Sequence, residues 1–263
     1  MKEKRKKERD RKVNKKGQLT IFIILGLLIL MALILLFTRP DIKTFFVPKT
    51  TIEHIEDCAK IPIKDGIEIL NKQGGVINPQ NYYLYQGNKI EYVCYTKENF
   101  KTCVMQKPIL KNTIEDELKI YSQPKIIGCI NSIVESLEKS GYEVSMKTPN
   151  ISIELVPDNV LINLDIDLKI SKENTESYNN IRIGIKSKIY NFVMIASSIM
   201  TWETRFGDSE TLNYMLLYPS IKVEKKKQGE GSKIYIITDR DTEEKFMFAV
   251  RSAVIPPGLI GVR

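Results

Sequence analysis

The stretch Val160-Leu-Ile-Asn-Leu-Asp-Ile-Asp-Leu-Lys-Ile170 is apolar at every second position over six repeats. Successive side chains of a β-strand point to opposite faces, so this alternation predicts a strand with one buried face and one solvated face. Antiparallel sheets commonly have this arrangement, with helices covering the buried face. The stretch therefore predicts an α+β fold in which antiparallel sheets are covered by helices on one face.

Other strand patterns lie on both sides of this stretch, and turn residues or prolines bound them. They cover residues 82–85, 90–95, 142–147, 151–156, 221–226, 233–238 and 245–254. The first two flank Gln86-Gly87-Asn88, a sequence that is typical of the turn of a β-hairpin.

Helical periodicity appears in three regions. Thr51 is a suitable N-cap, and Gly74-Gly75 ends the apolar pattern that follows it, which predicts one helix between them. A second region predicts two pieces, one beginning near residue 112 and one running from Pro124 to Lys139, because proline favours the first turn of a helix. The third is an amphipathic helix from about 186 to 205. Its candidates for burial are Ile189, Phe192, Val193, Ala196, Ile199, Met200 and Trp202.

An uncharged segment of 21 residues, from Gln18 to Thr38, precedes all these elements. As an α-helix it would be roughly 30 Å long, which matches the hydrocarbon core of a bilayer. The first sixteen residues hold ten Lys and Arg against three acidic residues, a net charge of +7 out of +8 for the whole chain. By the positive-inside rule, this predicts a cytoplasmic N-terminus, a transmembrane helix and an extracytoplasmic C-terminal part.

The expected organisation is therefore a basic cytoplasmic tail (1–17), a transmembrane helix (18–38), a stalk (39–50) and an extracytoplasmic α+β domain (51–263). A boundary inside this domain, near 142–150, is left open. No small-x-small cleavage site follows the apolar segment, so an uncleaved anchor is expected at the cell membrane.

Lys15-Lys16-Gly17-Gln18, followed directly by the apolar run, resembles the class III signal peptide of archaeal type IV pilin-like proteins. This resemblance implies cleavage by a prepilin peptidase between Gly17 and Gln18. Phe22 stands where assembling pilins usually carry an acidic residue, and Pro40 is expected to end the helix, so membrane anchorage is the firmer implication. The segment from Cys58 to Gly75 is similar to a Cys-bearing helix of uncharacterised single-span archaeal proteins.

Four cysteines follow the apolar segment, and an even number outside the cytoplasm predicts disulfide bonds. Cys94 and Cys103 enclose a short polar stretch that suits a hairpin loop, so they are expected to pair. Cys58 and Cys129 remain, and their pairing would join two helices. Free buried thiols are one alternative. A metal site using His54, Asp57 and Cys58 is another, although the chain has no second histidine.

Other candidate sites rest on weaker patterns. Asn163, Asp165 and Asp167 share one strand face and are weak candidates for a hard cation, because the glycine and distal glutamate of an EF-hand are missing. Glu203 and Asp208 are a conceivable carboxylate pair for glycoside hydrolysis. Asn150 begins a glycosylation sequon. A cluster of tyrosines around the predicted hairpin is a candidate binding face: Tyr82, Tyr83, Tyr85, Tyr92 and Tyr95.

No catalytic motif emerges from the sequence, and no cofactor, small-molecule substrate or nucleic-acid partner is indicated. The expected function is a binding, adhesion or envelope-structural role for a membrane-anchored protein, with the lipid bilayer and a surface or envelope protein as partners. A pilin-like filament component is a variant of this role. The alternatives are an extracytoplasmic hydrolase whose carboxylates converge only in three dimensions, and an accessory subunit of a sensor or transporter.

Overall fold

The computed structural model describes residues 22–31 and 50–255, and the chain divides into two compact units, Met1–Thr50 and Thr51–Arg263. Residues 22–31 in the first unit are helical. The ends of the predicted span Gln18–Thr38, the basic tail, the Gly17–Gln18 bond and the stalk up to residue 49 lie outside the described residues. Within the part of the chain that the structure describes, no helix is both long enough and apolar enough to cross a membrane.

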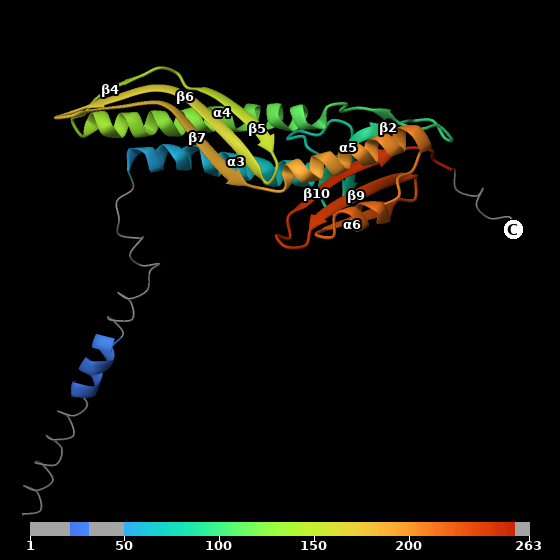
Figure 1. Ribbon diagram of the computed structural model, residues 1–263, viewed down its shortest axis with the longest axis horizontal. Helices are drawn as coiled ribbons and strands as arrows, with labels where there is room; N and C mark the ends of the chain where they lie inside the picture. The colour runs from blue at the N-terminus through green and yellow to red at the C-terminus, as the bar shows by residue number, and fades with distance from the viewer. Residues whose placement is uncertain (1–21, 32–49, 256–263) are drawn as a thin grey trace, which may run out of the picture. The chain divides into compact units, whose positions relative to one another are not determined.

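The second unit is an α+β domain with two sheets (Figure 1). Its elements, in chain order, are α3 (Thr51–Gln73), β1 (Tyr82–Tyr85), β2 (Asn88–Tyr95), β3 (Val104–Met105), α4 (Leu110–Lys139), β4 (Glu143–Met146), β5 (Asn150–Val156), β6 (Asn159–Ser171), β7 (Thr175–Lys186), α5 (Ile189–Phe206), α6 (Leu212–Leu217), β8 (Ile221–Lys227), β9 (Ser232–Asp239) and β10 (Lys245–Arg251).

The smaller sheet is built around β6, the strand that the alternating stretch predicts. β4 and β5 pair with different parts of β6, β7 pairs with it from end to end, and all these pairings are antiparallel. The six predicted inward residues of β6 are all buried: Val160, Ile162, Leu164, Ile166, Leu168 and Ile170. The alternation is therefore confirmed. β7 was not predicted from the sequence, because only its second half carries an apolar alternation, at Ile181, Ile183 and Ile185.

The larger sheet has the order β1-β2-β10-β9-β8, with β3 also paired to β2. The predicted hairpin is confirmed as β1 and β2, and its two-residue turn has positive φ at Gln86 and Gly87. β10 lies beside β2 in the parallel direction. The larger sheet is therefore mixed, and the prediction of wholly antiparallel sheets was wrong for this pair. Parallel neighbours need a long connection, and here most of the domain lies between them.

Helix α3 follows the prediction, with Pro62 inside it and Gly74 (φ 75°) directly after it. The prediction of two pieces between residues 112 and 139 was wrong, since α4 is one helix that continues through Pro124. Its buried residues recur every four positions on both sides of the proline: Leu110, Ile114, Leu118, Ser122, Ile126 and Ile130. This continuous buried stripe offsets the hydrogen bond that Pro124 removes.

Disulfide bonds are confirmed, and the pairs are those that the sequence favours. Cys58 of α3 is bonded to Cys129 of α4, with 5.6 Å between their Cα atoms. Cys94 of β2 is bonded to Cys103, which directly precedes β3, with 5.4 Å between their Cα atoms. The first bond joins the two long helices, which pack on each other, and the second closes the short loop between antiparallel strands.

The main core lies between the helices and one face of each sheet. On the larger sheet it receives alternate residues of β9 and β10, including Tyr235, Ile237, Phe246 and Phe248. Residues of β2, β9 and β10 that point to the opposite face form a smaller cluster: Ile90, Tyr92, Ile234 and Ala249, with Tyr83, Tyr85 and Tyr95 packed at its margin. The larger sheet therefore has apolar residues on both faces.

Candidate functional site

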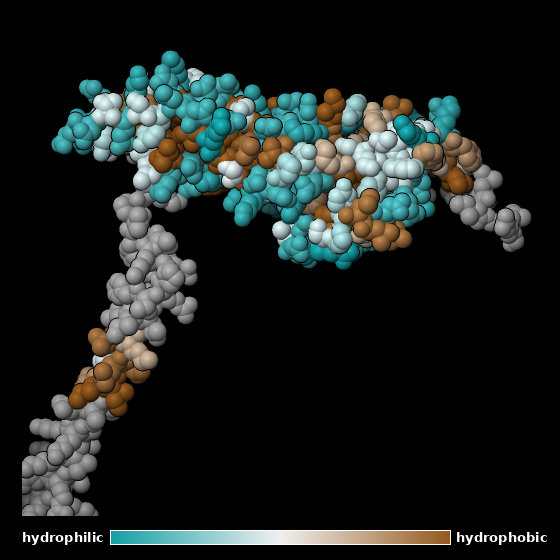
Figure 2. Space-filling model, viewed as in Figure 1, coloured by the Kyte–Doolittle hydropathy of each residue, from teal (hydrophilic) through white to brown (hydrophobic). Residues whose placement is uncertain are grey.

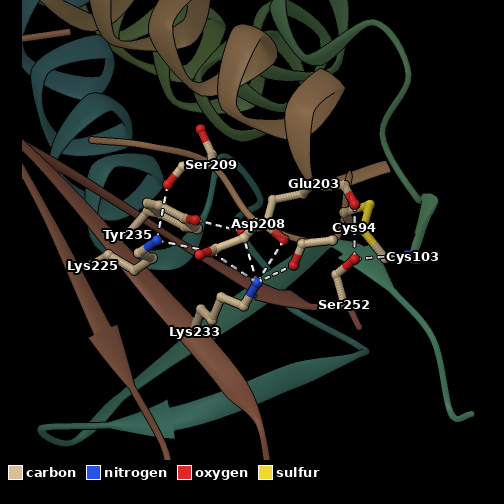
Figure 3. A network of polar contacts seen from close by, with 10 residues as sticks. Cys94, Cys103, Glu203, Asp208, Ser209, Lys225, Lys233, Tyr235 and Ser252 are labelled. Atoms are coloured by element: carbon tan, nitrogen blue, oxygen red, sulfur yellow. Dashed lines mark hydrogen bonds and ion pairs between the residues drawn. A yellow bond between two sulfur atoms is a disulfide. The ribbon is translucent and has the colours of Figure 1, made fainter. Parts of the chain in front are cut away.

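Helix α5 ends at a buried charge network that joins its last turn to the larger sheet (Figure 3). Gly207 caps the helix in the left-handed conformation, with φ 75°. The ammonium group of Lys233 on β9 donates to both carboxylate oxygens of Glu203, at 2.8 and 3.1 Å, and to the carbonyl oxygen of Gly207. It also lies 3.2 Å from Asp208 Oδ1. A single lysine therefore neutralises the glutamate and satisfies a carbonyl at the helix C-terminus.

Three further groups complete this network. The Tyr235 hydroxyl donates to Glu203, and Lys225 of β8 donates to Asp208 Oδ1 at 2.8 Å and to the carbonyl of Ser209 at 2.9 Å. Ser252 Oγ donates to the carbonyl of Glu203 and accepts from the amide of Cys103, which links the network to the disulfide loop.

Burial and charge act in opposite directions on the carboxylates. Burial raises the pKa of Glu203, although Lys233 and Tyr235 pull it down. Burial also opposes ionisation of Asp208, but Lys225 and Lys233 together hold its pKa below the ordinary value. The pKa of Tyr235 is raised by burial and by the neighbouring Glu203 carboxylate. Tyr235 therefore remains a donor to Glu203 across the physiological pH range.

The structure does bring Glu203 and Asp208 together, as the sequence hypothesis of a carboxylate pair requires. Lys233 lies between them, however, and Glu203 is completely inaccessible to solvent. A glycosidase needs one carboxylic acid that can protonate a leaving group and a second group that faces the sugar. This arrangement does not provide them, so the network instead fixes the segment 207–211 against β8 and β9.

The segment that the network holds forms one end of a groove between α5 and α6. A cavity of about 480 Å³ lies at this end, lined by Ser198, Trp202, Ser209, Glu210, Asn213, Tyr214, Leu216 and Leu217. A second cavity, of about 450 Å³, continues along α5 toward its N-terminus, and Met194, Tyr190, Lys188, Tyr218 and Asp239 are among its lining residues. Both cavities are lined by Ser198, Tyr214 and Leu217, so they are adjoining compartments of one groove.

Apolar side chains surround this groove and face solvent. We call them the α5–α6 surface: Met194, Trp202, Phe206, Leu212, Leu216, Leu217 and Tyr218, each 40–72% exposed. Figure 2 shows hydrophobic atoms gathered over α6. The prediction that Trp202 is buried was wrong, because the ring is 49% exposed and packs on Phe206 instead. Helix α6 was not predicted, although the run Leu212 to Leu217 contains four apolar residues that could have indicated it.

The disulfide removes one of the two weaker metal candidates, and the other lies on the solvated face of β6. Cys58 is bonded to Cys129, so it cannot join His54 and Asp57 as a ligand. Asp167 is paired with Lys147 at 3.1 Å, and Asn163 and Asp165 lie along the solvated face of β6. Among the described residues, no group of three or more His, Cys, Asp or Glu side chains is arranged to hold a metal ion.

The tyrosine cluster is divided between the two faces of the hairpin. Tyr83, Tyr85, Tyr92 and Tyr95 belong to the smaller apolar cluster, and Tyr92 is buried with its hydroxyl 2.6 Å from Ser232 Oγ. Tyr82 points to the opposite face and is 40% exposed. Most of these rings therefore serve packing. Asn150, the first residue of β5, has an exposed side chain.

Comparison with protein-family models, with curated proteins and with solved structures gives no match of the chain to any of them. The functional interpretation therefore depends on the site itself.

Proposed function

We propose that this chain is a single-pass, membrane-anchored protein whose extracytoplasmic domain binds a protein partner through the α5–α6 surface. The observation that carries the binding role is the concentration of exposed apolar side chains around the groove. Apolar patches of this kind on a folded domain mark sites of interaction, because leaving them in water forgoes about 25 cal/mol for each Å². Tryptophan and tyrosine are also the residues most enriched at energetic centres of interfaces.

Two features support the proposed location. The uncharged segment from Gln18 to Thr38 has bilayer length, and a strongly basic tail precedes it. The domain after it carries two disulfide bonds, which form and persist in oxidising compartments. Protease added to intact cells should therefore degrade the domain, while an antibody epitope at the N-terminus survives until the cells are permeabilised. A domain that is degraded only after permeabilisation would refute this orientation.

The binding role is tested by two matched substitutions. Leu216 on α6 and Ile120 on α4 are both about 70% exposed, at 69% and 73%, but only Leu216 belongs to the α5–α6 surface. Proteins that co-purify with the chain from detergent-solubilised membranes should be lost in Leu216→Asp and retained in Ile120→Asp. Equal recovery with both variants would contradict a role for this surface.

The same purified material tests the pilin-like variant of the proposal. Intact mass of the native chain should show a first residue of Gln18 if a prepilin peptidase processes it. A chain that begins at Met1 or Lys2 would exclude processing, while the anchoring role would stand. The same measurement reports whether Asn150 carries a glycan.

A further inference from the structure

We infer that the groove between α5 and α6 receives an amphipathic helix of the partner, with a lysine or arginine of that helix placed over Ser209 and Glu210. This inference rests on the proposed binding function and specifies the chemistry of the partner. Three properties of the groove carry it: its length, its mainly apolar surface and the Glu210 carboxylate at one end.

The length of the groove suits a short helix. Its lining residues on α5 run from Lys188 to Trp202, which corresponds to roughly 20 Å of helix or about four turns. Each compartment is large enough for one or two large side chains, since a cavity of roughly 150 Å³ holds a benzene ring. Apolar side chains on successive turns of a bound helix would fill the two compartments in order.

The lining of the groove argues against an extended peptide. An extended chain presents one N–H and one C=O group per residue, and each must find a partner when it is buried. The two hydroxyls shared by both compartments are already used, because Ser198 and Tyr214 bond to each other at 2.9 Å. A helix satisfies its backbone internally, so it buries only side chains in such a groove.

The end of the groove beside Ser209 and Glu210 suits a positively charged side chain. Ser209 is 1% exposed, and its Oγ has no hydrogen-bond partner among the described residues. In Figure 3 this hydroxyl points away from the network to which the Ser209 carbonyl belongs. Glu210 lines the same cavity, and its carboxylate makes one hydrogen bond within the described chain, a long one of 3.4 Å from the Leu212 amide, and no ion pair. Asp208 is already neutralised by Lys225 and Lys233.

A lysine or arginine side chain would supply the hydrogen-bond donor that Ser209 Oγ lacks and a positive charge for the Glu210 carboxylate. Its N–H groups donate to the Glu210 carboxylate and to Ser209 Oγ, and hydrogen bonds with a charged donor are stronger than neutral ones. An acidic side chain here would face the Glu210 carboxylate and be repelled. The groove therefore distinguishes partners by the sign of the charge at this end.

A lipid acyl chain is the competing occupant of an apolar groove. It would fill the compartments but leave the exposed Phe206 and Leu212 uncovered beside them, whereas a helix about 10 Å wide covers both groove and margin. The two occupants are distinguished in the experiment below, because Trp202 is the only tryptophan of the chain and lines the groove.

The experiment uses the full chain in nanodiscs of zwitterionic lipid and a displayed library of 16-residue helical peptides. Selected peptides should carry apolar residues at i, i+4 and i+7 with one Lys or Arg, and their binding should shift the emission of Trp202. Glu210→Lys should weaken these peptides about tenfold and should itself select peptides with Asp or Glu at the same position. An unchanged unfolding midpoint verifies that the variant is folded.

Each outcome has a defined meaning. Selected peptides that bind without changing Trp202 emission, or whose charge preference survives Glu210→Lys, would overturn this inference while leaving the binding function in place. If nanodisc lipid already shields Trp202 from quenching by iodide, the α5–α6 surface contacts the membrane, and this inference is also overturned. An absence of any selected peptide, together with equal partner recovery from Leu216→Asp and Ile120→Asp, would refute both proposals.

Discussion

Replacing Lys233 by Met tests whether the buried network holds α5 to the larger sheet. Met has a similar size but no charge, so the substitution leaves the inaccessible Glu203 carboxylate without its counter-charge and the Gly207 carbonyl without its donor. Removing one partner of a buried ion pair costs about 3–5 kcal/mol. For a domain of this size, each kcal/mol lowers the melting temperature by roughly 2–4 °C, so a fall of about 10 °C is expected.

The cost of Lys233→Met should depend on pH. Burial already raises the pKa of Glu203 above its ordinary value of 4.5, and Lys233 is the largest opposing influence. Without Lys233 the folded-state pKa rises further, while the unfolded-state pKa stays ordinary. Between these two values, the folded state binds a proton that the unfolded state lacks, so stability decreases as pH rises. The variant should therefore be penalised less at pH 5 than at pH 8.

Thermal and urea unfolding, followed by circular dichroism at both pH values, measures this effect. Lys226→Met, on the exposed face of β8, is the matched control and should leave the transition unchanged. Glu203→Leu in the Lys233→Met background should restore part of the lost stability, since no charge then remains buried at that position. A loss below about 1 kcal/mol, or one that is the same at both pH values, would refute the description of this network as a buried, mutually dependent charge cluster.

Two further substitutions probe other constraints on the domain. Replacing both cysteines of the disulfide between α3 and α4 by Ala should lower the free energy of unfolding by about 4 kcal/mol, and the same change at the disulfide beside β3 should lower it by about 2.5 kcal/mol. The first disulfide closes a loop of 71 residues and the second a loop of 9, so the first restricts the unfolded chain more. Equal losses in urea unfolding would contradict this chain-entropy account. Gly207→Ala should cost at least about 2 kcal/mol, since the added Cβ would lie 2.1 Å from the Cβ of Ala253 at a φ of 75°. Ala253 also has positive φ (47°), so the double variant is compared with Ala253→Gly alone, and against that reference Gly207→Ala should cost less because the clash is gone. An equal cost in both backgrounds would argue against the clash. Gly128→Ala, in open space on α4, should stabilise by about 1 kcal/mol.

Local patterns predicted much of this fold. The strict alternation of β6 and the capped helix α3 depend on neighbours in sequence, and both are observed as predicted. β7 was missed because its first half, Thr175 to Asn180, is polar and largely exposed, so that pairing with β6 rather than burial makes it a strand. Pro124 was read as a helix start, although buried contacts on both sides outweigh the missing hydrogen bond.

The candidate site was much harder to predict than the fold. The parallel pairing of β10 with β2 joins segments about 150 residues apart, and no local pattern encodes it. Lys233 is charged, which argues against burial, yet it shares the core face of β9 with Tyr235 and Ile237 and is buried because Glu203 of α5 pairs with it. Trp202 was expected in the core because it is apolar, yet it is exposed. An apolar side chain alone does not distinguish a core position from a binding surface.

The parallel pairing of β2 with β10 also sets an order of events during synthesis. β10 is the last strand along the described chain, yet it lies in the middle of the larger sheet, between β2 and β9. A nascent chain can form the β1–β2 hairpin early and the β8–β9 hairpin only near the end of synthesis, and the two join in one sheet only when residues 245–251 have emerged from the ribosome. Until then, Val93 and Tyr235 lack their neighbouring strand, and such late, non-local closure is slow. The larger sheet therefore stays in two separate parts for most of the translation of the domain.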